Sequence, residues 1–234
     1  IFFGYVFSKK RVDLYHSIPV NRKKLFTANY VTGIIVYYVG MLPALIISIV
    51  IAAVNHYLTL KVLGNIVMTL FVNTVHFLYI YSATVFVIML TGNMIVALLG
   101  TGVVTMFVPT LCALIESLQS DMFVTYSQCT SVREPAIVRF AALSPVVSFV
   151  NMAERFNDWD ENAYLSAGEA FSDLIAPIIV TLIILAAAYV LYLKRPSEAA
   201  GKALAFKLSR AVIEIPIVIM GGLIGGWFMN TSVT

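Results

Sequence analysis

The stretch LFTANYVTGIIVYYVGMLPALIISIVIAAV, residues 25–54, contains no acidic and no basic side chain. An α-helix that crosses the hydrocarbon core of a bilayer needs about 20 mostly apolar residues. Backbone N–H and C=O groups in hydrocarbon have no water to bond, so a run of this length must satisfy them within a helix. The stretch therefore predicts a membrane-spanning α-helix.

Further apolar runs of this kind follow along the 234-residue chain. They cover residues 62–90, 94–115, 174–193 and 211–229, and residues 1–7 look like the end of an earlier span. The alternating segments of about ten residues that a membrane β-barrel requires do not occur in the sequence. The sequence predicts an all-α, polytopic membrane helix bundle with about five full transmembrane helices plus the end of another.

The amino-acid composition also indicates a membrane protein. The chain is 60% hydrophobic and 12% charged, with a mean hydropathy of +0.92, whereas a soluble domain is about 45–50% apolar and about 25% charged. We interpret residues 1–234 as one transmembrane domain and as a segment of a longer protein. Cys112 and Cys129 lie outside any C-x-x-C spacing; we expect two unpaired thiols, and a disulfide between them stays open.

Positive charge gathers in two segments, with six Lys or Arg in residues 8–24 and five in residues 194–210. Four predicted spans separate these segments, so both return to the same side of the membrane. Lys and Arg concentrate in cytoplasmic loops, which predicts that both segments and the turn at residues 91–93 are cytoplasmic. Residues 55–61 and 116–173 then lie outside, and the second of these holds three basic against nine acidic residues.

The predicted outer loop contains the apolar run PAIVRFAALSPVVSFVNMAERF, residues 135–156. Proline interrupts a helix, so the run predicts two short helices that are separated at Ser144 and Pro145. Each half is too short to span, which suits a re-entrant or interfacial helix. A small cap on the outer ends of the spans is the other interpretation.

Motifs that would indicate catalysis are absent from the sequence. It contains no G-x-x-x-x-G-K-[ST], no H-E-x-x-H and no G-x-S-x-G. His16, His56 and His76 are scattered without the spacing of metal ligands. We therefore expect no catalytic residue, no metal and no cofactor on this chain.

Two polar residues inside a predicted span, Asn73 and His76, are three positions apart and so share a helix face. They can line a pathway through the membrane, or cross-link helices by hydrogen bonds. In the last predicted span, small residues are expected to let helices approach closely. These residues are Gly221, Gly222, Gly225 and Gly226.

The first basic segment predicts a short helix over residues 9–18. Its apolar side chains can form one stripe: Val12, Leu14, Tyr15 and Ile18. Pro19 ends this helix, because the residue before a proline is displaced from helical backbone angles, and Asn21 is a favoured N-cap for the helix that follows. The stripe can lie on anionic lipid or can bind another protein.

Two stretches resemble ABC-2 type ABC transporter permeases, in particular Gram-positive bacterial permease subunits. DLYHSIPVNRKKLFTANY, residues 13–30, resembles the segment between their second and third spans. KRPSEAAGKALAFK, residues 194–207, resembles the basic loop after their sixth span. The chain has Ile-Pro-Val-Asn where the broad family often has Leu-Pro-Val-Ser, and Asn caps a helix as well as Ser does. The rest of the chain resembles these permeases by topology.

The resemblance implies that residues 9–19 are a coupling helix that docks on a separate ATP-binding cassette subunit. Its docking residues would be Val12, Asp13, Leu14, Tyr15, His16, Ile18 and Pro19. ATP would be bound and hydrolysed by that subunit, so the chain itself would not be an enzyme. The further implied partners are a second permease copy or a sister permease and membrane lipid, with no nucleic acid.

The family also implies a bacterial plasma membrane, alternating access and, because most relatives are exporters, export. The alternative is a secondary transporter or channel without an ATPase partner. That class predicts ion-coupling acids near the middle of the membrane.

Overall fold

The computed structural model describes residues 2–17, 19–122, 143–157 and 167–233. The regular structure in these residues is helical, and its only strand-like contact is an isolated antiparallel bridge between Thr91 and Leu204. The predicted all-α class is confirmed. The elements in chain order are η1 Gly4–Phe7, α1 Lys9–Ser17, α2 Arg22–Val54, α3 Leu60–Leu90, α4 Met94–Met122, α6 Pro145–Asn157, α7 Ala167–Lys194, η2 Ser197–Ala199 and α8 Lys207–Val233.

Within the described residues, four helices are long and apolar enough to cross a membrane. Their apolar parts are Arg22–Val54, Val62–Leu90, Met94–Gln119 and Leu174–Lys194, which correspond to four of the five predicted spans. The fifth predicted span lies within α8, which is helical but is not one of these four. The helices thus suggest a membrane-embedded, multi-pass protein, and the count of five spans is not confirmed.

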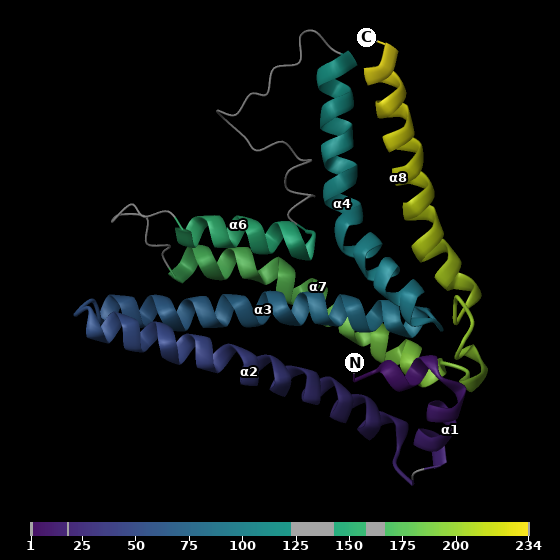
Figure 1. Cartoon of the computed structure of the whole chain (residues 1–234), viewed down its shortest axis with the longest axis horizontal. Coiled ribbons are helices and arrows are strands. Elements are labelled where there is room, and N and C mark those ends of the chain that lie inside the picture. Colours follow the sequence, from purple (N-terminus) through teal and green to yellow (C-terminus); the bar gives the residue numbers. More distant parts are fainter. Residues whose placement is uncertain (1, 18, 123–142, 158–166, 234) are drawn as a thin grey trace.

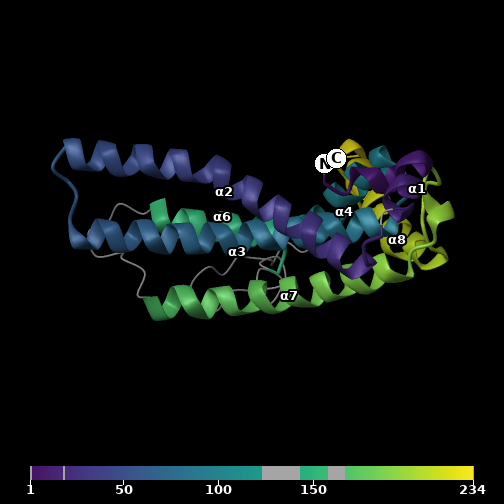
Figure 2. The ribbon, with the colours of Figure 1, turned by 90° about the horizontal axis from the view of Figure 1, so that it is seen from below.

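The helices form two groups (Figure 1). Helices α3 and α7 pack along each other, and α6 lies against α3 and α4. Helices α4 and α8 form a second pair, which rises at a steep angle from the end where α3 and α7 finish. In Figure 2, α3 lies between α2 and α7 over most of their length, and α2 crosses it to contact α7 near the start of α2. The most apolar stretch of α2 has no residue buried within the chain, so α2 is the peripheral helix of its group.

The start of α2 follows from local chemistry. Asn21 has extended backbone angles, and its side-chain oxygen accepts a hydrogen bond from the Lys23 N–H at 3.1 Å. This bond satisfies one of the N–H groups that a helix leaves without a partner at its first turn. Helix α1 ends at Ser17, before Pro19. The predicted cap and the predicted helix end are both confirmed.

A column of aromatic rings joins α2 to α3. Successive ring centroids lie 3.9–6.1 Å apart, and most of these distances fall in the range of about 4.5–7 Å that aromatic pairs prefer. The order along the column is Tyr37, Phe77, Tyr81, Tyr30 and Phe26. Gly33 makes room for it, since a Cβ at that position would collide with the Tyr81 hydroxyl. That hydroxyl donates at 3.4 Å to the carbonyls of Asn29 and Tyr30, so the Tyr81 side chain of α3 reaches the backbone of α2.

The glycines of α8 do not act as predicted within this chain. At Gly221, Gly222, Gly225 and Gly226, an added Cβ would meet no atom within 4 Å among the described residues. The expected close approach of another helix is therefore not present at these positions, because α8 packs on α4 through other residues, such as Ile213 against Gly100.

The predicted break in the outer loop coincides with the start of α6 at Pro145. The Ser144 hydroxyl donates to the Thr105 carbonyl of α4 at 2.7 Å, which holds the beginning of α6 against that helix. The other predicted short helix, over residues 135–143, lies almost entirely outside the described residues.

Candidate functional site at the basic end of the helices

The two basic segments of the sequence lie together in space. Helix α1 contacts both η1 and η2, and the stretch after α7 lies at the same end of the molecule as α1 (Figure 1). The turn at residues 91–93 lies there too, because it follows the end of α3.

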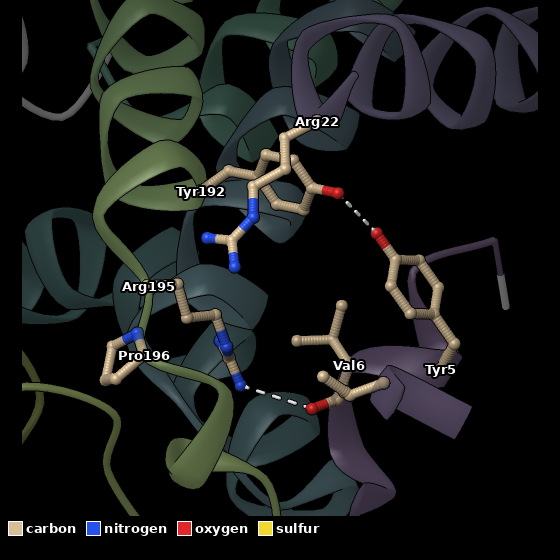
Figure 3. A pocket seen from close by; sticks show the side chains of 7 residues that line it. Tyr5, Val6, Arg22, Tyr192, Arg195 and Pro196 are labelled. Carbon is tan, nitrogen blue, oxygen red and sulfur yellow. Dashed lines mark hydrogen bonds between the residues drawn. The ribbon is translucent and has the colours of Figure 1, made fainter. Parts of the chain in front are cut away.

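Arg195 connects several segments at this end of the molecule. Its guanidinium is buried, and its Nη1 donates to the carbonyls of Ile88 and Met89, each at 2.8 Å. Its Nη2 donates to the Thr91 carbonyl at 2.7 Å and to the Val6 carbonyl at 3.4 Å (Figure 3). The last carbonyls of a helix have no partner within it and carry its partial negative charge. Arg195 therefore caps α3 and ties the opening segment of the chain to that cap.

The hydrogen-bond partners of Arg195 in the described part of the chain are carbonyl oxygens and not carboxylates. Burial lowers the pKa of the Arg195 guanidinium to about 10, and the group therefore still carries its charge at neutral pH. A buried charge is tolerated only where polar groups replace its water. Here the oriented carbonyls at the end of α3 supply that replacement.

Backbone hydrogen bonds join the two connections that lead into α4 and α8. The Gly92 N–H donates to the Ala203 carbonyl at 3.3 Å, and the Ala205 N–H donates to the Leu90 carbonyl at 2.8 Å. A Cβ at position 92 would collide with the Ala199 carbonyl. Gly92 is therefore required for the close approach of these two connections, from which α4 and α8 both start.

Helix α1 packs on η1 through one face only. Val12 is buried, and the Tyr15 ring stacks on Tyr5 with centroids 4.2 Å apart. Leu14 is 63% exposed, and Asp13 is exposed as well. Val12 and Leu14 therefore do not share one stripe as predicted. They are two positions apart, and such residues point in nearly opposite directions on a helix of 3.6 residues per turn.

The other predicted docking residues give less information. Pro19 is exposed, directly before the cap of α2. Ile18 and the side chain of His16 lie outside the described part of the chain. Of the seven predicted docking residues, the structure therefore leaves Asp13, Leu14 and Pro19 open to a partner and covers Val12.

The two polar residues singled out in the third helix have different surroundings. His76 is buried, its Nδ1 pairs with the Val72 carbonyl at 2.9 Å, and its Nε2 pairs with the Ser148 hydroxyl at 3.0 Å. Because a carbonyl only accepts, Nδ1 donates, and in the neutral imidazole Nε2 then accepts from the Ser148 hydroxyl. The bond to Ser148 joins α3 to α6, and the bond to Val72 lies within α3. Asn73 instead lines a cavity of about 220 Å³ between the same two helices, and its role in a pathway stays a prediction.

The described residues add little on thiols and metals. Cys112 is a free thiol on α4, and Cys129 lies outside the described residues. No group of three or more His, Cys, Asp or Glu side chains gathers in the described ranges.

Sequence reasoning missed the role of Arg195, which it treated only as one of five basic residues that orient the chain. A basic residue directly after a helix is a weak signal for a cap, and nothing in the sequence shows that α7 ends beside α3. No protein-family model, curated protein or solved structure matches the chain. The conclusions on function accordingly come from the residues and their geometry.

Proposed function

We propose that the chain is the transmembrane permease subunit of an ABC transporter, an exporter that moves its substrate by alternating access. A separate ATP-binding cassette subunit supplies the energy. In this proposal the protein is a multi-pass protein of a bacterial plasma membrane with five spans, α8 providing the fifth. Residues 8–24 and 194–210 face the cytoplasm, and a second permease copy or a sister permease completes the transport path. The resemblance of residues 13–30 and 194–207 to ABC-2 permeases supports it.

The observation that carries the proposal is the series of contacts that connects α1 to the membrane helices. Val12 and Tyr15 bind α1 to η1, and the Val6 carbonyl of η1 accepts a hydrogen bond from Arg195. Arg195 in turn holds the end of α3 and directly follows the end of α7. A force applied to α1 would therefore reach two helices of the bundle through buried contacts. A coupling helix needs such a connection, whereas a helix that only rests on lipid does not.

The exposed side of α1 is the surface that the ATP-binding subunit would cover. Leu14 is the large apolar side chain on this side, and Asp13 lies beside it. The few residues that become fully desolvated near the centre of an interface carry most of its binding energy, and a polar rim surrounds them. Leu14 is therefore the contact that we expect to dominate docking.

The test is co-purification of the chain with the ATP-binding subunit encoded beside it. Leu14→Glu places a charge in the proposed interface without touching the buried side of α1, and we expect it to abolish association. Tyr57→Glu is the matched control, since Tyr57 is 72% exposed in the connection between α2 and α3. The control variant should associate as the parent does. Normal association of Leu14→Glu would contradict the coupling-helix assignment.

A second measurement separates this proposal from a secondary transporter or channel. Substrate movement into inverted membrane vesicles should stop when the Walker A lysine of the ATP-binding subunit is replaced. Movement that continues and follows an ion gradient would favour the rival class. In that case Asn73, which lines the cavity between α3 and α6, would be the first residue to replace.

A further inference from the structure

Two hollows lie next to each other along the seam between α2 and α7. The first, of about 20 Å³, is lined by basic and phenolic side chains that include Arg22, Arg195, Tyr5 and Tyr192 (Figure 3). The second, an apolar groove of about 350 Å³, is lined among others by Phe26, Tyr30, Leu182, Leu185 and Tyr189.

An aromatic contact joins a lining residue of one hollow to a lining residue of the other. Tyr192 lines the pocket and Phe26 lines the groove, and their ring centroids are 5.3 Å apart. Along α2 the lining residues proceed from Arg22 to Phe26 and Tyr30. Along α7 they proceed from Tyr192 through Tyr189 toward Leu182. The groove therefore lies next to the pocket and follows both helices toward their apolar stretches.

The pocket carries an excess of positive charge. Two guanidinium groups, of Arg22 and Arg195, reach it, and no carboxylate lines it. Arg195 donates to carbonyls, but Arg22 is exposed and has no hydrogen bond or ion pair with another described residue. Arg22 is also the first residue of α2, where the helix dipole disfavours a cation. An anion bound here would pair with the Arg22 guanidinium and would also interact favourably with the positive end of the α2 dipole.

The tyrosine pair leaves one donor for such an anion. The hydroxyls of Tyr5 and Tyr192 are 2.8 Å apart, so one donates to the other. Two hydroxyls hold two protons, and their mutual bond uses one. The second proton can be donated to a ligand. A hollow of about 20 Å³ admits one water-sized atom, which is the size of one phosphate oxygen, and the other oxygens would remain at the open side with Arg22.

We propose that a phospholipid with a net negative headgroup binds along the seam between α2 and α7. Its phosphate lies between Arg22 and the Tyr5–Tyr192 hydroxyl pair, and an acyl chain fills the groove beside Phe26 and Leu185. Guanidinium groups bind phosphate through charge-assisted hydrogen bonds, and basic pockets between membrane helices are suited to anionic lipid headgroups. The proposal does not depend on transport, because it uses only the pocket, the groove and the membrane location.

The test is native mass spectrometry of the full chain in detergent, with phosphatidylglycerol and phosphatidylcholine of the same acyl chains and with inorganic phosphate. The wild-type chain should retain phosphatidylglycerol in preference to phosphatidylcholine. Arg22→Gln should weaken phosphatidylglycerol retention about fivefold, the effect of one basic residue near an anionic surface. Lys23→Gln is the matched control, with the same loss of charge one residue away, and should retain the lipid as the wild type does.

Two further variants test the two halves of the site separately. Tyr5→Phe together with Tyr192→Phe keeps both rings but removes the hydroxyl proton that is left for the anion, and should weaken phosphatidylglycerol retention. Tyr5→Phe alone leaves the Tyr192 hydroxyl with a free proton and should retain the lipid. Ala186→Phe fills the groove, which Ala186 lines, and should reduce retention of the lipid without a change of charge. Ala44→Phe, at an exposed position elsewhere on α2, should leave retention unchanged.

Three results would overturn the proposal. Equal loss in Arg22→Gln and Lys23→Gln would show general attraction to a basic surface and no site. Equal retention of the two lipids by the wild type would remove the role of the charge. Competition by inorganic phosphate at the concentration of the lipid, with no effect of Ala186→Phe, would identify the ligand as a free phosphate group and not a lipid.

Discussion

Replacement of Arg195 by methionine removes the guanidinium that caps α3, while the apolar volume of the side chain is largely kept. The change removes the guanidinium hydrogen bonds to the carbonyls of Ile88, Met89 and Thr91, and these three bonds are 2.8 Å or shorter. The Ile88 carbonyl keeps a longer bond from the Thr91 N–H at 3.4 Å. A hydrogen bond to a charged group contributes about 1.5–3 kcal/mol to stability, so the three together contribute about 4.5–9 kcal/mol. Water that enters beside the methionine side chain can bond to these carbonyls and restores part of the lost stability.

We therefore expect Arg195→Met to lower the free energy of unfolding by at least about 4 kcal/mol, a large part of the about 5–15 kcal/mol that a folded domain has. The assay is denaturant unfolding of the purified chain in detergent micelles, followed by far-ultraviolet circular dichroism. Arg195→Lys keeps the charge but has one donor nitrogen in place of Nη1 and Nη2. Its free energy of unfolding should fall between those of the parent and the methionine variant.

Lys194→Met is the matched control, because Lys194 is exposed beside Arg195 and loses the same charge. Exposed positions of this kind change stability by about 0.5 kcal/mol or less. A loss below about 1 kcal/mol for Arg195→Met, or an equal loss for both variants, would refute the assignment of Arg195 as the cap of α3.

Three more outcomes follow from the packing and the orientation. Gly33→Ala should destabilise the chain by about 1–3 kcal/mol in the same unfolding assay, since its Cβ collides with the Tyr81 hydroxyl. Gly40→Ala, on the same helix with open space around it, should be neutral or slightly stabilising; equal effects would contradict the packing of α3 on α2. Ser148→Ala should cost about 1 kcal/mol through loss of its hydrogen bond to His76, and no change in unfolding would show that this bond does not hold α6. A cysteine at position 57 should react with a membrane-impermeant reagent added outside intact cells, and a cysteine at position 202 only after the cells are opened; the reverse pattern would contradict the orientation.

The parts of the fold that depend on neighbouring residues were predictable from the sequence. The cap at Asn21, the end of α1 before Pro19 and the turn between α3 and α4 all follow from the chemistry of a few adjacent residues. Long apolar runs predicted α2, α3, α4 and α7, since hydrocarbon allows such runs little choice of structure. These predictions required no knowledge of which helices pack together.

The features that were not predictable depend on contacts between distant segments. Arg195 meets Val6 and the end of α3, and no local pattern gives a pairing over that separation. Periodicity gives the direction of each side chain around α1 but does not show which side η1 covers, so Val12 and Leu14 were placed on one surface. Gly33 was not noticed, because its small size matters only where Tyr81 approaches.

The most direct test of the transport assignment is a photo-reactive amino acid at position 14, irradiated in membranes of cells that express the chain at its natural level. The residue on the exposed side of α1 should form a covalent product with the ATP-binding subunit, identified in the product by a Walker A sequence. The same group at position 57, in the connection between α2 and α3, should give no such product. Products formed at position 14 with lipid alone would contradict the central claim, since α1 would then rest on the membrane and transmit no force from an ATPase.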